Sequence, residues 1–330
     1  MALLSRRTPL TLFLLTVFSA AAQAAEHDAA DWLERMIRSS HQLNYSGTFV
    51  YQQNGSLQSM KIIHAVNEDG ERERLVSLTG PTREVIRNRE RVTCFLPEDS
   101  SIVVEHAGSP PPFPMQLPSD LEPLRKYYDI HLEGEDRIAG LTARKVVIAP
   151  RDSYRYGQTF WVAKDSGLLL RAEVINEKGE IVEQVMFTSL EMHDDIPDSQ
   201  LEPQVSGKAK VLHLNGQPLQ AKDVDVRQHE SWSVSALPPG FSQQLQRNHF
   251  LPDKKYPVEH HVYSDGLASV SVFIERHSKD DDAFVGGSAM GGVNAYGRIM
   301  GDHSVTVVGE VPPVTVKQIA ESLQQVNPDD

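Results

Sequence analysis

The spacing of hydrophobic positions changes several times along this 330-residue chain. An apolar run from Leu10 to Ala22 follows two arginines, a layout that predicts an export signal and is short for a membrane span. Residues 28–43 repeat their apolar positions at helical spacing, which predicts an amphipathic helix. From Tyr45 onward apolar and polar residues alternate. The pattern therefore predicts a leader, one helix and a body of strands.

Turn signals follow one another at short intervals after this helix. Asn54-Gly55 is a strong hairpin signal, and the runs between later turns are strand-like. Because no long helical pattern interleaves, we expect an α+β fold whose sheet is mainly antiparallel. Val146, Val147 and Ile148 are consecutive and would point to both faces of that sheet. One face can take the first helix, and the other packs on a second protein layer or lines an apolar cleft.

The strand pattern lapses after about 200 residues and then resumes. Ala22-Gln-Ala24 fits a cleavage site, which predicts a signal peptide over 1–24. The predicted N-terminal domain covers 25–202, a linker covers 203–222, and a smaller α+β domain covers 223–326. Apolar positions at helical spacing predict that this second domain closes with a helix over 314–326.

Amino-acid composition argues against some classes of function. The formal net charge is −13, and the predicted leader removes only positive charge, so a nucleic-acid partner is not expected. Cys94 is the one cysteine, which excludes an internal disulfide in an oxidising compartment. It lies in a strand-like apolar run, which favours an unreactive buried thiol. We expect an exported, periplasmic protein.

The glycine-rich stretch GGSAMGGVNAYG, Gly286–Gly297, raises the question of catalysis. A hydrolase elbow requires G-x-S-x-G around the nucleophile, and Met290 occupies the last position of the match around Ser288. The stretch also lacks G-x-G-x-x-G and a Walker lysine. We interpret it as a place where the backbone bends, and we expect no enzyme, no catalytic residue and no cofactor.

Two groups of polar residues were candidates for ligand contacts. The 13 histidines are scattered, and the neighbours His260 and His261 would face opposite sides of a strand, so we expect surface histidines and no metal site. Arg87, Arg89 and Arg91 would share one strand face and are candidates for contacting an anion. The interleaved glutamates leave ordinary surface ion pairing as the alternative.

Ten stretches, taken in order, resemble the MucB/RseB family of periplasmic regulators of envelope-stress sigma factors of the sigma-E or AlgU type. This resemblance implies an N-terminal unclosed β-barrel with helices, similar to LolA and LolB, and a smaller α+β C-terminal domain. It implies no catalysis. The stretches are Tyr45–Tyr51, Tyr127–Asp129, Pro150–Gly157, Asp165–Leu170, Asn176–Gly179, Leu237–Phe241, Tyr263–Leu267, Val272–Glu275, Gly291–Tyr296 and Val305–Pro312.

The resemblance also implies partners. Family members bind the periplasmic region of a membrane-bound anti-sigma factor of the MucA/RseA type and shield it from the site-1 protease. Lipid, lipopolysaccharide above all, is expected to reach an apolar cleft and loosen that complex. Our candidates for this cleft are Ile62 and Val103, with Phe113 and Met115 in a proline-rich segment that is either a lid or a connector. A lipid or lipoprotein carrier without a regulatory partner is the alternative, and homo-oligomerisation stays open.

Overall fold

The computed structural model describes residues in two regions that together form three sheets. The predicted signal peptide, 1–24, and the predicted linker beyond residue 204 lie outside the described residues. The described ranges are 29–68, 70–88, 91–95, 102–105, 117–118, 120–204, 231–249, 256–277 and 282–326.

The larger region is one antiparallel sheet of eleven strands in the order β6-β5-β4-β3-β2-β1-β11-β10-β9-β8-β7. Its end strands, β6 and β7, do not pair with each other within the described residues, so the sheet is unclosed. A 3-10 turn, η1 (Glu122–Lys126), leads into β7. The strands are β1 (Asn44–Gln53), β2 (Ser56–Asn67), β3 (Gly70–Ser77), β4 (Glu84–Arg87), β5 (Arg91–Phe95), β6 (Ile102–Glu105), β7 (Tyr128–Ile138), β8 (Leu141–Pro150), β9 (Gly157–Ala163), β10 (Leu169–Ile175) and β11 (Ile181–His193).

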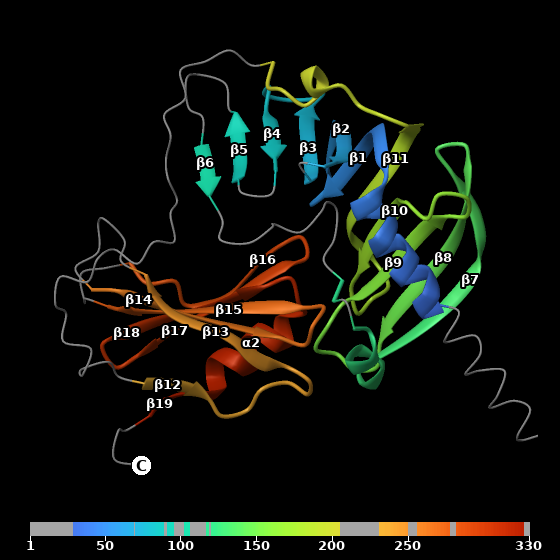
Figure 1. The fold of residues 1–330 in the computed structure, drawn as a ribbon. Coiled ribbons are helices and arrows are strands. Elements are labelled where there is room, and N and C mark those ends of the chain that lie inside the picture. Colours follow the sequence, from blue (N-terminus) through green and yellow to red (C-terminus); the bar gives the residue numbers. More distant parts are fainter. Residues whose placement is uncertain are drawn as a thin grey trace, which may run out of the picture.

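The predicted first helix is confirmed over 29–42, where it crosses one face of the large sheet in front of β9 and β10 (Figure 1). Leu33 and Met36 of the helix share a buried cluster with Phe160 and Val162 of β9. Trp161, between them, points to the opposite face and packs in a different cluster. The strands are therefore apolar on both faces, as their consecutive hydrophobic residues predicted.

The opposite face is covered in part by the chain that leaves β11. Ile196 and Leu201, on either side of the short turn η2 (Asp198–Gln200), pack with Ile63 and Ala65 of β2. A second protein layer therefore lies on that part of the outer face.

The smaller region combines a six-stranded antiparallel sheet, a two-stranded ribbon and one helix, and it confirms the predicted α+β class. Leu323 packs in the same apolar cluster as helix residues Val316 and Ile319. The elements are β12 (Ser231–Val234), β13 (Ser242–His249), β14 (Val258–Ser264), β15 (Ser269–Arg276), β16 (Gly286–Met290), β17 (Val293–Met300), β18 (His303–Gly309), α2 (Pro313–Ser322) and β19 (Leu323–Val326).

The helix predicted over 314–326 was wrong at its C-terminal end. It stops at Ser322, and the four residues of β19 pair with β12 instead. The Ser322 hydroxyl donates to the carbonyl of Gln318 at 2.7 Å, and the Ser322 carbonyl accepts from the backbone N–H of Ser235 at 2.9 Å. Pairing with a strand far away in sequence overrides the helical spacing of the apolar residues.

Both glycine-containing turns behave as predicted. Asn54 and Gly55 have φ of 55° and 73° between β1 and β2, the left-handed values that a two-residue hairpin turn requires. The stretch Gly286–Gly297 is a second hairpin, β16 to β17, with Gly291 at its tip and a φ of 63°. Ser288 lies exposed on the edge strand β16. In the described ranges, no helix is long and apolar enough to cross a bilayer.

Candidate functional site

The loop between β8 and β9 presents a buried arginine to the smaller region. The Asp152 carboxylate accepts bonds from the backbone N–H of Tyr154 at 2.9 Å and from Arg155 Nε at 3.0 Å. This local turn fixes the side chain of Arg155, which is only 1% exposed. An arginine this deeply buried requires a charged partner.

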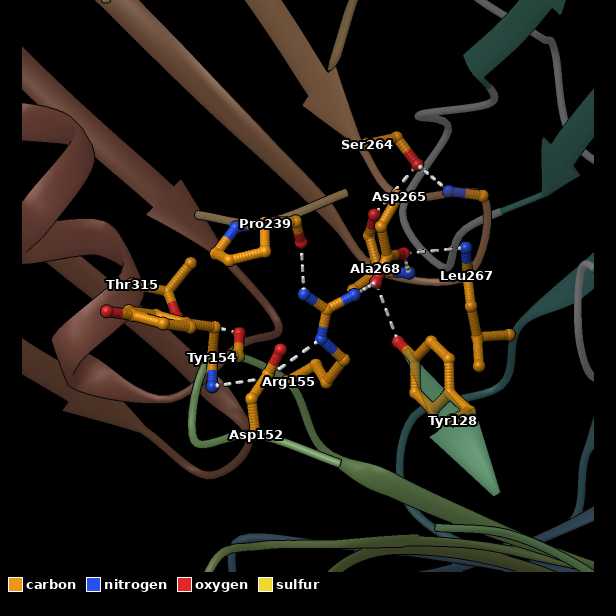
Figure 2. Close-up of polar contacts among 11 residues, drawn as sticks. Tyr128, Asp152, Tyr154, Arg155, Pro239, Ser264, Asp265, Leu267, Ala268 and Thr315 are labelled. Carbon is orange, nitrogen blue, oxygen red and sulfur yellow. Dashed lines mark hydrogen bonds and ion pairs between the residues drawn. The ribbon is translucent and has the colours of Figure 1, made fainter. Parts of the chain in front are cut away.

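The partner of Arg155 comes from the other region, in the turn between β14 and β15 (Figure 2). Oδ2 of Asp265 accepts bonds from Arg155 Nη1 and, at 2.8 Å, from the Tyr128 hydroxyl. Oδ1 accepts from the backbone N–H groups of Leu267 at 2.9 Å and Ala268 at 2.7 Å. Both oxygens of a fully buried carboxylate are thus bonded, which offsets its loss of water.

Aromatic rings enclose the rest of the guanidinium. Its carbon lies 4.9 Å from the ring centre of Tyr127, 5.4 Å from that of Tyr128 and 5.3 Å from that of Phe241. Nη2 donates to the carbonyl of Pro239. We call this assembly, from Asp152 and Arg155 to Asp265 and its ring neighbours, the Arg155 junction.

The pKa values of Arg155 and Tyr128 in the Arg155 junction are both raised. Burial alone would lower the pKa of Arg155, but bonding to Asp152 and the charge of Asp265 outweigh it and raise the pKa. Burial, and then the charge of Asp265, raise the pKa of Tyr128, so its phenol remains a donor. Arg155 and Tyr128 therefore both keep their protons, which suits a structural connection rather than proton transfer.

Further contacts surround the Arg155 junction. The Thr315 hydroxyl, at the start of α2, donates to the carbonyl of Tyr154 at 2.7 Å. The Asn294 amide donates to the Tyr156 hydroxyl at 2.9 Å. Gly240 has a φ of 86° and approaches Tyr127 so closely that an added Cβ would lie 2.5 Å from the ring. Leu267 packs against the apolar cluster of the larger region.

A second contact joins the tip of the β1–β2 hairpin to the tip of the β16–β17 hairpin. The pocket between them has a volume of about 210 Å³ and is lined by Asn54, Gly55 and neighbouring residues of β1 and β11, together with Gly291. Beside it, a Cβ added at Gly292 would lie 2.9 Å from Glu310 Oε1 and 3.3 Å from Val182 Cγ2, so the tip of the β16–β17 hairpin packs against β11. We call this the tip contact.

Comparison with known proteins identifies both regions. The model of the MucB/RseB N-terminal domain matches residues 28–205, and that of the MucB/RseB C-terminal domain matches residues 226–324. The chain belongs to the MucB/RseB family. Its two domains are joined by the Arg155 junction and the tip contact.

Named relatives are regulatory proteins, which supports the expectation that this MucB/RseB member is not an enzyme. The sigma factor AlgU regulatory protein MucB of Pseudomonas aeruginosa is 35% identical over 333 residues, covering 96% of this chain and 98% of the relative. The sigma-E factor regulatory protein RseB of Escherichia coli K12 is 29% identical over 309 residues, covering 93% and 94%.

Solved MucB structures share the fold. The complex of Pseudomonas aeruginosa MucA and MucB has a TM-score of 0.70 at 31% identity, covering 91% of this chain and 99% of the other. A crystal structure of MucB has a TM-score of 0.59 at 32% identity, covering 91% and 98%. A LolA-superfamily protein of Nitrosomonas europaea is also similar, at 10% identity and a TM-score of 0.24, covering 54% and 98%.

Of the three predicted anion contacts, Arg87 lies in a charged region of the MucB/RseB N-terminal domain. Arg87 is buried, and its Nη2 donates to Glu71 at 2.7 Å and to Glu73 at 2.9 Å. Arg89 and the side chain of Arg91 lie outside the described residues. Contact with an external anion stays a prediction, in which the ligand would compete with two glutamates for Arg87.

The predicted surface location was wrong for two of the interleaved glutamates. Glu73 and Glu84 are each 3% exposed, and Arg74 donates to Glu84 at 3.1 Å on a buried part of the sheet. Burial opposes ionisation of Glu71, but bonds from His64 and His41 and the charge of Arg87 lower its pKa to about 2. These ion pairs offset the free-energy cost of removing the carboxylates from water.

Of the four lipid-cleft candidates, only the side chain of Ile62 lies within the described residues. Ile62 is fully buried in a cluster with Phe49 and Phe187, where it acts as core. The side chain of Val103, in β6, lies outside the described residues, as do Phe113 and Met115. The cleft assignment therefore stays a prediction.

The expectation of surface histidines was wrong at several positions. His64, His260, His261 and His303 are all buried. His261 shows the reason, because its ring nitrogens are bonded to Glu259 at 2.6 Å and to the Tyr263 hydroxyl at 3.1 Å. Such partners allow a strand to bury an imidazole. Within the described residues, no group of three or more His, Cys, Asp or Glu is arranged to hold a metal.

The Arg155 junction was not predicted, although the sequence contains a signal for it. Three of the stretches that carry the family resemblance, Pro150–Gly157, Leu237–Phe241 and Tyr263–Leu267, supply the ion pair, the Pro239 carbonyl and the Phe241 ring. These three stretches, far apart in the sequence, therefore converge at the connection between the domains.

Proposed function

We propose that this chain is a periplasmic regulator that binds the periplasmic segment of a membrane-bound anti-sigma factor of the MucA/RseA type. The observation that carries the proposal is the similarity, along both domains, to the MucB that was solved in complex with MucA. The leader-like residues 1–24 support export, with cleavage after Ala24.

The arrangement of the domains supports binding by the two domains together. The TM-score to MucB in complex with MucA(peri) is 0.70, against 0.59 to MucB without a named partner. The Arg155 junction ties the domains through a buried ion pair rather than through a chain connection alone. A client surface that spans both domains would be present before the client arrives, which reduces the entropy lost on binding.

We propose further that the bound anti-sigma segment is protected from site-1 proteolysis and is released when lipid occupies an apolar cleft. Two ligands that oppose each other in this way have an unfavourable coupling energy. A hundredfold weakening of the complex requires about 2.7 kcal/mol. An acyl chain that buries about ten methylenes gains roughly 8 kcal/mol, so partial coupling is sufficient.

A protection assay tests this function. The mature chain is mixed with the periplasmic segment of the anti-sigma factor from the same bacterium, the site-1 protease is added, and lipopolysaccharide is titrated in. We expect the chain to slow cleavage and lipopolysaccharide to restore it. Cleavage at the same rate with and without the chain would contradict client binding, and protection that persists at saturating lipid would contradict the lipid switch.

A vesicle assay separates the regulator from a simple carrier. A carrier without a regulatory partner would move lipid between donor and acceptor vesicles and leave cleavage of the anti-sigma segment unchanged. We expect protection of the segment to be the property that this chain shows.

A further inference from the structure

The strand β16 is an unprotected edge of the C-terminal domain. It ends the six-stranded sheet, and within the described residues it pairs with β17 alone (Figure 1). Proteins commonly protect a sheet edge with charges, prolines or bulges, because its unpaired N–H and C=O groups can pair with another chain. β16 has none of these devices. Its sequence, Gly286–Met290, contains no charged residue and no proline, and its register with β17 is unbroken.

The edge strand β7 of the N-terminal domain shows the protected arrangement. Glu135, Asp136 and Arg137 are charged and exposed. The register of β7 with β8 also shifts between Leu132 and Glu135. A second chain that paired with this edge would have to bury charge and follow a bulge. One edge of the molecule is therefore closed to strand pairing, and β16 is open to it.

The backbone of β16 is accessible to a partner. Gly287 has no side chain, so its exposure is exposure of the backbone itself. A two-residue turn joins β16 to β17, and Met290 pairs with Val293 beside that turn. The pair next to a two-residue turn exchanges hydrogen bonds, and pairs with and without hydrogen bonds then alternate along the ladder. Gly287 and Ala289 therefore direct their N–H and C=O groups away from β17.

Apolar side chains surround this free edge. Val285 and Met290, at the two ends of β16, are 64% and 67% exposed, and Ile299 of β17 is 45% exposed. Arg298, next to Ile299, donates to the carbonyl of Ala320 at 3.0 Å, which places α2 on the Arg298 face of the sheet. Because side chains alternate along a strand, Met290 and Ile299 lie on the face that α2 leaves open. Exposed apolar side chains grouped beside an open edge mark an interaction surface.

We propose that β16 is the docking edge for an extended stretch of the anti-sigma client, which adds to the C-terminal sheet as a further strand. The inference rests on the proposed function and deepens it, because it names the edge that binds the client and the conformation that the client adopts. The backbone of β16 supplies the hydrogen bonds, and Met290 and Ile299 select apolar side chains at alternate positions of the client.

The tip contact favours an extended client over a second copy of this chain. β16 ends where a Cβ added at Gly291 would lie 1.8 Å from the Asn54 amide oxygen, so the N-terminal domain adjoins this end of the edge. An added strand needs only about 4.8 Å beside its neighbour. A second copy would also have to fit its own N-terminal domain, and its formal net charge of −13, alongside. An edge that adjoins both domains fits a client surface that spans them.

Hydrogen exchange of the mature chain, resolved to single amides by NMR, tests the docking edge. The probe is the periplasmic segment of the anti-sigma factor from the same bacterium. We expect the amides of Gly287 and Ala289 to exchange at least about tenfold more slowly in the complex, while those of the edge strand β7 are unchanged. Slower exchange that depends on the concentration of the chain alone, without the segment, would place a second copy at this edge and overturn the client assignment.

Two variants at neighbouring positions separate the backbone from the side chains. Ala289→Pro removes an outward N–H without removing a bond to β17, and edge strands tolerate proline at such positions. We expect it to weaken binding of the segment at least about tenfold in a calorimetric titration, because the added strand loses a hydrogen bond and meets the proline ring. Ser288→Ala keeps every backbone group and should bind as the parent chain does. Urea unfolding of both variants checks that they are folded, and the exchange measurement on the parent chain decides if Ala289→Pro is not.

The parent chain distinguishes failure of the docking edge from failure of the proposed function. If the parent chain binds the segment while the amides of β16 exchange as before, or while Ala289→Pro binds equally well, the docking edge is wrong and client binding stands. Absence of binding by the parent chain would contradict the proposed function and the docking edge together.

Discussion

The two contacts between the domains differ in how deeply they are buried. The Arg155 junction buries an arginine against an aspartate, and both side chains are inaccessible to solvent. The tip contact brings together Asn54, Gly55 and Gly291, all of which are exposed. Breaking a buried ion pair is costly, whereas contacts at an exposed rim contribute little. The Arg155 junction is therefore the contact that holds the two domains together most strongly.

Arg155→Met removes the buried ion pair between the domains and should have the largest effect on the free energy of unfolding. Removal of the cation leaves Asp265 buried without its charge partner, which costs about 3–5 kcal/mol. Urea unfolding of the mature chain measures the loss. Arg151→Met is the matched control, because Arg151 is half exposed and bonds Asp129 at 3.5 Å; it should cost less than about 1 kcal/mol. Equal losses of unfolding free energy in the two variants would show that the buried ion pair contributes no more stability than an exposed one.

Gly240→Ala tests the close packing around the Arg155 junction. Its φ of 86° is unfavourable for alanine, and the new Cβ would meet the ring of Tyr127 at 2.5 Å. Gly179 has a similar φ of 78° with nothing within 4 Å, so Gly179→Ala isolates the backbone strain. We expect Gly240→Ala to destabilise the chain by about 1–3 kcal/mol more than Gly179→Ala in urea unfolding. Equal midpoints would mean that Tyr127 moves aside without cost.

Gly291→Ala, at the exposed tip contact, should have the smallest effect on the free energy of unfolding. Its Cβ would collide with the end of the Asn54 side chain, which can rotate away. Gly286→Ala, at φ 94° with open space, is the control for strain. We expect a difference in unfolding free energy below about 0.5 kcal/mol between the two variants in urea unfolding. A clearly larger loss for Gly291→Ala would show that Asn54 cannot rotate away from the added methyl group.

Local patterns explain why much of the fold was predictable. The helix over 29–42 and the hairpin at Asn54-Gly55 depend on residues next to each other in sequence. β19 was missed because its conformation depends on β12, which lies some ninety residues earlier in the chain. Helical spacing cannot reveal such a partner.

The candidate site was predictable only through the resemblance. Arg155 and Asp265 are 110 residues apart, and a charged residue in a loop is usually solvated, so nothing local marked them as a buried pair. Arg87 was singled out because arginines cluster in that part of the chain, but its glutamate partners were assigned to the surface. Burial depends on the curvature of the whole sheet, which residue spacing does not give.

The most direct test of the account is a calorimetric titration of the mature chain with the periplasmic segment of the anti-sigma factor from the same bacterium. The account predicts saturable binding by the parent chain and by Arg151→Met. It predicts binding weakened at least about tenfold, or about 1.4 kcal/mol, by Arg155→Met, because the domains no longer hold the client surface together. Absence of binding by the parent chain, or equal affinity for Arg155→Met, would contradict it.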